Sequence, residues 1–337
     1  MDYNELGRSG LKVSGFGLGV MTFGGQTPED DAMRQMDMAY DAGITFFDSA
    51  ENYPTPTGPE TQGESERILG RWIAERGLHG KVVVATKVAG PGNAAGDMTH
   101  IRGAERCLDR ANITAAVDAS LARLGTDCID LYQVHWPERP ITTLWRSRWS
   151  VVPDPPGLIP IEETLGVLAD LVREGKIRAF GVSNESPWGL MRYLAIAKQR
   201  GQPRVSSIQY SYSLLDRYFE LGLAEIAMRE QVGLIGYSPL ARGLLTGKHL
   251  TGEGSARLSE NKRRAVSDYV ALARENGLEP AQMALAFARQ QPFMASVLMA
   301  ASSVSQLSTN IAAIEVTLSK DLVKAINRIH DSNPNPK

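Results

Sequence analysis

The sequence predicts an α/β fold, a (β/α)8 TIM barrel with an N-terminal β-hairpin cap, formed as a single domain over residues 1–337. Eight short segments of β-favouring residues each precede a stretch in which apolar side chains recur with helical spacing. The segments are apolar nearly throughout, as expected of parallel strands that are covered on both faces. Eight such units favour a closed barrel over an open doubly wound sheet, which is the alternative for this pattern.

The elements follow one another in regular order. Residues 1–14 carry Gly7 and Ser9-Gly10 between short alternating segments and are expected to form the hairpin. The expected strands are Phe16–Met21, Thr45–Asp48, Val82–Val88, Ile129–His135, Ile177–Val182, Val205–Tyr210, Gly233–Ser238 and Ala295–Ala300. The expected helices cover 29–42, 63–76, 113–124, 161–174, 187–199, 219–230, 263–276, 280–290 and 303–313. A C-terminal helix is expected over 319–330, with a tail rich in proline and asparagine after it.

One connection, 136–160, is much longer than the others. Loops of this length without regular structure are uncommon in compact domains and often bind ligands. The alternative is a packed surface excursion. Three tryptophans favour a substrate-side loop, and these are Trp136, Trp145 and Trp149.

Composition excludes several classes of function. The net charge is −2 and no long basic run occurs, so neither nucleic acid nor an anionic membrane is an expected partner. The two cysteines, Cys107 and Cys128, have no metal-ligand spacing and give no disulfide framework. The N-terminal residues lack the features of a signal peptide, and no stretch is apolar enough to span a membrane. We therefore expect a cytoplasmic protein.

Polar residues at the ends of three adjacent expected strands could carry chemistry. An unpaired ammonium in the apolar run Val82–Val88 would be costly, so Lys87 needs a partner, and Asp48 is the natural counter-ion. Tyr53 follows Asp48 by five residues, and His135 ends the next strand. A nearby ammonium is expected to lower the tyrosine pKa from its ordinary value of about 10. Together the four residues predict a proton-delivery site, with Tyr53 and Lys87 within or close to hydrogen-bond reach.

Each of these residues has a simpler explanation when taken alone, because a single strand-end histidine or aspartate is more often packed or solvated than catalytic. Other chemistries have less support. The chain has no Gly-x-Ser-x-Gly elbow, no His-Glu-x-x-His motif, no P-loop and no Cys/His cluster. The run Gly15–Gly19 fails as a dinucleotide fingerprint, because its third glycine is misplaced and no helix follows at once.

The chain resembles the aldo-keto reductases, which are NADP-dependent (β/α)8 barrel enzymes, over essentially its whole length. The motifs that carry the resemblance are Leu18–Gly24, Asp48–Tyr53, Ala85–Lys87, Leu131–Pro137, Gly181–Asn184, Tyr210–Leu215 and Tyr237–Lys248. Within the family, the segment Glu60–Gly63 and the tryptophan-containing loop look most like the bacterial Tas-type branch, which is related to potassium-channel β subunits.

The resemblance implies a role for each matching residue. Tyr53 would be the general acid, Lys87 and Asp48 would tune it, and His135 would orient the substrate. Ser183, Asn184 and Gln209 would bind the nicotinamide carboxamide, and Tyr237 would stack on the nicotinamide ring. The other expected cofactor-binding residues are Gly19, Val20, Met21, Asp48, Ser238, Pro239, Leu240, Arg242, Gly243, Lys248, Ser303, Gln306 and Asn310. The expected substrate-lining residues are Met21, Tyr53, His135, Trp136, Trp145 and Trp149.

Two departures from the family concern the cofactor. Relatives often carry a basic residue at the position of Ser303, where it helps hold the 2′-phosphate, so Lys248 or Arg242 is expected to contribute here. The segment 249–258 is also shorter than the cofactor-covering loop of the family. We still expect NADPH in preference to NADH.

The leading hypothesis is therefore NADPH-dependent reduction of small aldehydes and ketones to alcohols by hydride transfer, with Tyr53 as proton donor. A second hypothesis is an NADP(H)-binding redox-sensing regulatory subunit with slow turnover, which the kinship to channel subunits motivates. A third is a barrel hydrolase or isomerase without nicotinamide. The sequence leaves the physiological substrate and the oligomeric state open.

Overall fold

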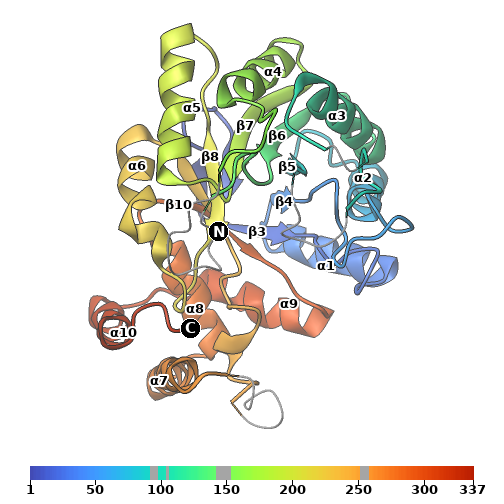
Figure 1. Ribbon diagram of the computed structural model, residues 1–337. Coiled ribbons are helices and arrows are strands. Elements are labelled where there is room, and N and C mark those ends of the chain that lie inside the picture. The colour runs from blue at the N-terminus through green and yellow to red at the C-terminus, as the bar shows by residue number, and fades with distance from the viewer. Residues whose placement is uncertain (92–97, 104–105, 142–152, 251–257) are drawn as a thin grey trace.

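The computed structural model describes residues 1–91, 98–103, 106–141, 153–250 and 258–337. Eight parallel strands close into a barrel in the order β10-β3-β4-β5-β6-β7-β8-β9, which confirms the predicted (β/α)8 TIM barrel (Figure 1). The barrel strands are β3 (Phe16–Gly19), β4 (Phe46–Asp48), β5 (Val83–Val88), β6 (Ile129–Val134), β7 (Ile177–Ser183), β8 (Ser207–Ser211), β9 (Gly233–Tyr237) and β10 (Met294–Met299).

Helices surround the strands and shield their outer faces (Figure 1). They are α1 (Glu29–Asp41), α2 (Glu64–Arg76), α3 (Arg110–Leu124), α4 (Ile161–Arg173), α5 (Pro187–Arg200), α6 (Leu223–Glu230), α7 (Glu260–Glu275), α8 (Pro280–Arg289), α9 (Val304–Ile311) and α10 (Lys320–Ser332). The segment expected as one helix over 219–230 divides into the 3-10 turn η1 (Tyr218–Leu221) and α6, with Gly222 between them. The C-terminal helix starts at Lys320 because Ser319 caps it, accepting a hydrogen bond from the Leu322 amide.

The N-terminal hairpin closes the amino end of the barrel, as expected. Strands β1 (Tyr3–Glu5) and β2 (Lys12–Ser14) pair antiparallel. Three of its side chains are buried against the side chains that fill the barrel interior, and these are Leu6, Leu11 and Val13. Water is thereby excluded from that end, so the opposite end, where the strands finish, is the open one.

The barrel interior is built in layers, as the two-residue period of parallel strands requires. One layer is apolar and includes Phe46, Ala85, Leu131, Ala179 and Ile235. Two residues further along the same strands the layer becomes polar. Its members on β4, β5, β6 and β9 are Asp48, Lys87, Gln133 and Tyr237. The sequence therefore places a polar floor directly beneath the carboxyl ends of the strands.

The expected long loop 136–160 contains no helix or strand in its described parts, 136–141 and 153–160. Trp145 and Trp149 lie outside the described residues. None of the helices in the described part of the chain is both long and apolar enough to cross a membrane.

Candidate active site

Lys87 and Asp48 form a buried ion pair at the centre of the polar floor. The Lys87 Nζ donates to Asp48 Oδ2 at 2.6 Å and to the Ser49 carbonyl oxygen at 2.7 Å. Lys87 is fully buried and Asp48 is 3% exposed. Burial lowers the pKa of Lys87, while the charge of Asp48 and the hydrogen bond to it oppose that shift. The pairing expected from the sequence is present, because β4 and β5 are neighbours in the barrel.

Two glutamine amides complete the surroundings of Asp48. Its Oδ1 accepts from Gln133 Nε2 at 3.0 Å and from Gln209 Nε2 at 2.8 Å. Gln209 was an expected site residue, whereas Gln133 was not. The signal that could have found Gln133 is its position two residues after Leu131, on the same inward-facing side of β6 as that core residue.

Tyr53 and His135 meet above this floor. Their ring centroids are 5.8 Å apart with an interplanar angle of 83°, so one ring presents its edge to the face of the other. The Lys87 Nζ lies 5.1 Å from the centroid of the Tyr53 ring. Residues from three strand ends are therefore gathered within one small volume, as the sequence led us to expect.

The pKa values correct one part of that expectation. The pKa of Tyr53 is raised rather than lowered, first because the ring is desolvated and second because the Asp48 carboxylate faces it. Within the described residues, the Tyr53 hydroxyl has no hydrogen-bond partner, and no hydrogen bond joins it to Lys87. Lys87 does not lower the tyrosine pKa because its charge is already matched by Asp48. Tyr53 is therefore a protonated phenol at neutral pH.

His135 is electrically neutral. Burial holds its pKa well below the ordinary value for histidine, and the Lys87 ammonium lowers it further. Its Nδ1 is buried without a hydrogen-bond partner among the described residues. A neutral imidazole beside a protonated phenol can donate a hydrogen bond to a carbonyl oxygen without competing for the proton that the phenol carries.

Asn184 connects two further strand ends to this group. It adopts a left-handed backbone conformation, with φ of 55°, directly after β7. Its Nδ2 donates to the His135 carbonyl oxygen at 2.9 Å and to Ser183 Oγ at 3.2 Å, and its Oδ1 accepts from the Tyr237 hydroxyl at 2.7 Å. Left-handed residues other than glycine are uncommon and concentrate at functional sites. Asn184 thus fixes the Tyr237 ring relative to His135.

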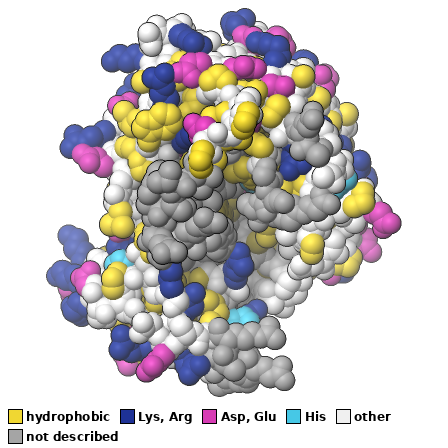
Figure 2. Space-filling model, in the orientation of Figure 1, with side chains coloured by type: hydrophobic (Ala, Val, Ile, Leu, Met, Phe, Trp, Pro, Cys, Tyr) yellow, Lys and Arg dark blue, Asp and Glu magenta, His cyan; other side chains and the backbone are white. Residues whose placement is uncertain are grey.

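The residues expected around the rest of a dinucleotide lie on the loop after β9 and at the start of α9. Ser238, Ala241 and Arg242 all have positive φ, followed by Gly243 at 84°. Arg242 and Lys248 are exposed, and Pro239 is buried. Figure 2 shows this face of the molecule hollowed near its centre, with Lys and Arg side chains in and beside the hollow.

Hydroxyl groups cluster at the start of α9. Ser303 caps the helix by accepting from the Gln306 amide, and Ser302 donates its Oγ to Gln306 Oε1 at 3.0 Å. Ser302 was not an expected site residue. Asn310 is buried near the other end of the helix and donates to the Ala300 carbonyl oxygen at 3.5 Å. The start of α9 can therefore offer hydroxyl groups and helix N–H groups to an anion.

The remaining expected residues line the rim. The Val20 amide donates to the Asp48 carbonyl oxygen at 3.0 Å, which places the end of β3, including Gly19, against β4. Met21 is 40% exposed and accepts a backbone hydrogen bond from Thr55. The Trp136 ring packs on His135, with 4.7 Å between ring centroids. Met21 thus lies against the segment that follows Tyr53, and Trp136 lies against His135; their role in lining a substrate stays a prediction.

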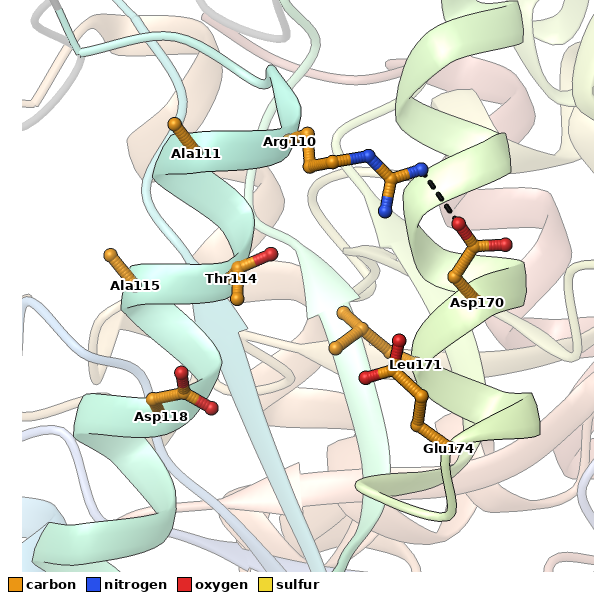
Figure 3. A pocket seen from close by; sticks show the side chains of 8 residues that line it. All are labelled: Arg110, Ala111, Thr114, Ala115, Asp118, Asp170, Leu171 and Glu174. Carbon is orange, nitrogen blue, oxygen red and sulfur yellow. Dashed lines mark hydrogen bonds and ion pairs between the residues drawn. The ribbon is translucent and has the colours of Figure 1, made fainter.

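A separate cavity of about 560 Å³ lies on the outer wall, between α3 and α4 (Figure 3). Its lining includes Arg110 and Asp170, which form an ion pair, and Asp118, which pairs with Lys176. These charges already satisfy one another on an open surface. Across the described residues, no group of three or more His, Cys, Asp or Glu side chains is arranged to hold a metal ion.

Comparisons with known proteins identify the family of the chain. The model of the Aldo/keto reductase family matches residues 16–331. The chain belongs to the aldo/keto reductase family.

The chain is 46% identical to Protein tas of Escherichia coli K12, over 98% of both chains. It is also 35% identical to the uncharacterized oxidoreductase YrpG of Bacillus subtilis, over 98% of this chain and 96% of that one. An aldo-keto reductase of Babesia bovis is 36% identical over 74% of this chain and 96% of its own. The expected Tas-type branch is confirmed, and family membership supports an oxidoreductase role.

Proposed function

We propose that this protein reduces aldehydes and ketones to alcohols with NADPH, and that Tyr53 donates the proton. The observation that carries the proposal is the gathering of a protonated phenol, a neutral imidazole and a buried Lys–Asp pair at the open end of the barrel. A carbonyl oxygen that receives a hydride at its carbon gains negative charge, and a positioned acid neutralises that charge in the transition state.

The residues at the strand ends fit a nicotinamide. Asn184 and Gln209 present amide groups from neighbouring strands, and Ser183 adds a hydroxyl, so a carboxamide would find both donors and acceptors. The half-buried Tyr237 ring, held by Asn184, gives a flat apolar surface beside them. The bound cofactor would supply the hydride. Tyr53 would give its proton to the carbonyl oxygen, and His135 would orient that oxygen by donating a hydrogen bond.

The preference for NADPH over NADH is also part of the proposal. Arg242 and Lys248 are exposed on the loop after β9, and Ser302 and Ser303 offer hydroxyl groups at the start of α9. Cations and helix N–H groups favour the additional phosphate of NADPH. A thermal-shift and fluorescence titration with each cofactor tests this preference. Equal affinity for the two would contradict it.

The decisive experiment is the Tyr53→Phe variant, assayed with NADPH and a panel of small aldehydes and ketones. General acids contribute about 100-fold to 10,000-fold, so we expect a loss of that size in kcat with little change in NADPH affinity. Tyr40→Phe is the matched control, because Tyr40 is half-buried on α1 against Trp72 and should behave as wild type. Wild-type turnover in Tyr53→Phe would refute the assignment of the proton donor. Tight NADPH binding without turnover in the wild type would favour the regulatory alternative.

A further inference from the structure

We propose that Gln133 is a positioning residue for this reaction. Its side chain links the Asp48–Lys87 pair to the amide of Gln209 through hydrogen bonds. The inference rests on the proposed function, since it concerns how the same site is held in order. Gln133 is fully buried, and it contacts both a member of the proton-delivery group and an expected nicotinamide-binding residue.

The position of Gln133 follows from strand register. On β6 it lies directly opposite Lys87 of β5, so both side chains enter the barrel at the same level. Its side chain is fully buried. On its other side β7 contributes Gly181, where an added Cβ would lie 3.5 Å from Gln133 Cγ and 2.3 Å from Ser207 Oγ. The missing Cβ therefore makes room for Ser207 of β8, while the Gln133 side chain lies in ordinary van der Waals contact with this position.

Gln133 helps to fix the orientation of the Asp48 carboxylate. Oδ2 faces the Lys87 ammonium, while Oδ1 takes the two amide donors of Gln133 and Gln209. A carboxylate held on both oxygens cannot rotate without losing a hydrogen bond, and the burial of Asp48 makes that loss costly. Hydrogen bonds to charged groups are among the stronger ones in proteins.

Gln133 also sets the orientation of the Gln209 amide. Its Oε1 accepts from Gln209 Nε2 at 3.4 Å, and the same Nε2 donates to Asp48 at 2.8 Å. Both N–H bonds of Gln209 then point into the barrel floor, so its Oε1 is left to accept a hydrogen bond from a carboxamide. The orientation of the nicotinamide and that of the Lys87 counter-ion are thereby coupled through one glutamine.

The pKa of Lys87 should change when the hydrogen bond between Gln133 and Asp48 is removed. Four titratable side chains act on Lys87 or face it, and these are Asp48, Glu66, Tyr53 and His135. Asp48 is the partner that contacts it directly. If Asp48 is less firmly held, the buried ammonium loses support and releases its proton at lower pH.

The test compares Gln133→Leu with Gln35→Leu. Gln35 is a matched control, because it is also fully buried, lies on α1, and has neither amide atom paired among the described residues. For Gln133→Leu we expect kcat about 10-fold lower, the alkaline limb of the pH–rate profile about one pH unit lower, and NADPH affinity several-fold weaker. Gln35→Leu should keep the wild-type profile and affinity. A merely structural role for Gln133 would lower the melting temperature without moving the pH limb.

Gln133→Glu provides the second variant and keeps the shape of the side chain. Because two carboxylates that share a site are costly to ionise together, the new carboxyl group should keep its proton at low pH and donate it to Asp48. We expect near wild-type activity at about pH 5.5 and a loss of at least about 10-fold by pH 8. This variant decides the question if Gln133→Leu does not fold.

The outcomes separate the two proposals. If the wild type reduces carbonyls and Tyr53→Phe does not, the proposed function stands. If both Gln133 variants then keep the wild-type pH profile and NADPH affinity, the positioning role of Gln133 is wrong. Absence of carbonyl reduction by the wild type would overturn the function, and NADPH affinity unchanged by Gln133→Leu would then overturn the positioning role as well.

Discussion

Replacing Lys87 by methionine tests whether the ion pair at the centre of the barrel is charged and why it is retained. The Nζ–Oδ2 distance of 2.6 Å corresponds to a gross attraction of about 6 kcal/mol at an effective dielectric constant of about 20. Taking the two ions out of water costs several kcal/mol for each. The intact pair therefore contributes little net stability, and its presence calls for a functional reason.

Removing one partner of the ion pair has a different effect on stability from replacing both partners. Lys87→Met leaves the Asp48 carboxylate buried with only the Gln133 and Gln209 amides, and removal of one partner of a buried pair costs about 3–5 kcal/mol. Because two donors remain, we expect the lower end, about 3 kcal/mol. Asp48→Asn leaves the Lys87 ammonium with the Ser49 carbonyl oxygen and an uncharged amide, and should cost more.

Equilibrium urea unfolding at pH 7, followed by circular dichroism, measures these changes in the free energy of unfolding. The double variant Asp48→Asn/Lys87→Met should recover at least about 2 kcal/mol of the summed losses, because neither charge is then left alone. If Lys87→Met changed stability by less than about 0.5 kcal/mol, the pair would not be ionic in the folded protein and our account of its electrostatics would be refuted.

Two further predictions concern other buried titratable groups at the site. Since burial and Lys87 hold the pKa of His135 below its ordinary value of about 6.5, the neutral ring contributes stability above that pH which is lost as pH falls through it. Between pH 7 and pH 5 the free energy of unfolding should thus fall by up to about 2 kcal/mol more for the wild type than for His135→Phe. Plots of unfolding free energy against pH that run parallel for the two proteins would contradict the lowered pKa of His135. Glu51 is buried two residues before Tyr53 and pairs with Arg102, which is 17% exposed, so Glu51→Gln should cost about 3 kcal/mol in urea unfolding and reduce kcat. The exposed pair of Glu75 with Arg76 is the control, and Glu75→Gln should leave the free energy of unfolding nearly unchanged.

The barrel could be predicted from the sequence because its signals are local. A parallel strand that is covered on both faces is apolar along its length, and glycines such as Gly125 and Gly201 end helices in the left-handed conformation. The division of the segment 219–230 was missed because its apolar spacing continues across Gly222. Only the backbone at that glycine shows that the 3-10 turn and α6 are separate.

The site could be predicted only in part, for a physical reason. Asp48, Tyr53, Lys87 and His135 stand out as polar groups at the ends of apolar strands, which a single sequence reveals. The partners of Asp48 are set by which strands face each other across the barrel, and Gln209 is 161 residues away from it. The direction of the Tyr53 pKa shift likewise depends first on how far the ring is desolvated and then on the charge of Asp48, and both are fixed by the packing around Tyr53 rather than by residue types.

The raised pKa of Tyr53 is compatible with its proposed role because catalysis depends on what changes during the reaction. Before proton transfer the phenol is neutral and needs no charged partner. The Lys87 ammonium has three N–H bonds, of which Asp48 and the Ser49 carbonyl oxygen use two, and its Nζ lies 5.1 Å from the Tyr53 ring. On the proposed mechanism, the third N–H meets the negative charge that appears on the Tyr53 oxygen as the proton leaves. That interaction is made in the transition state and not in the ground state, which is the kind that accelerates a reaction.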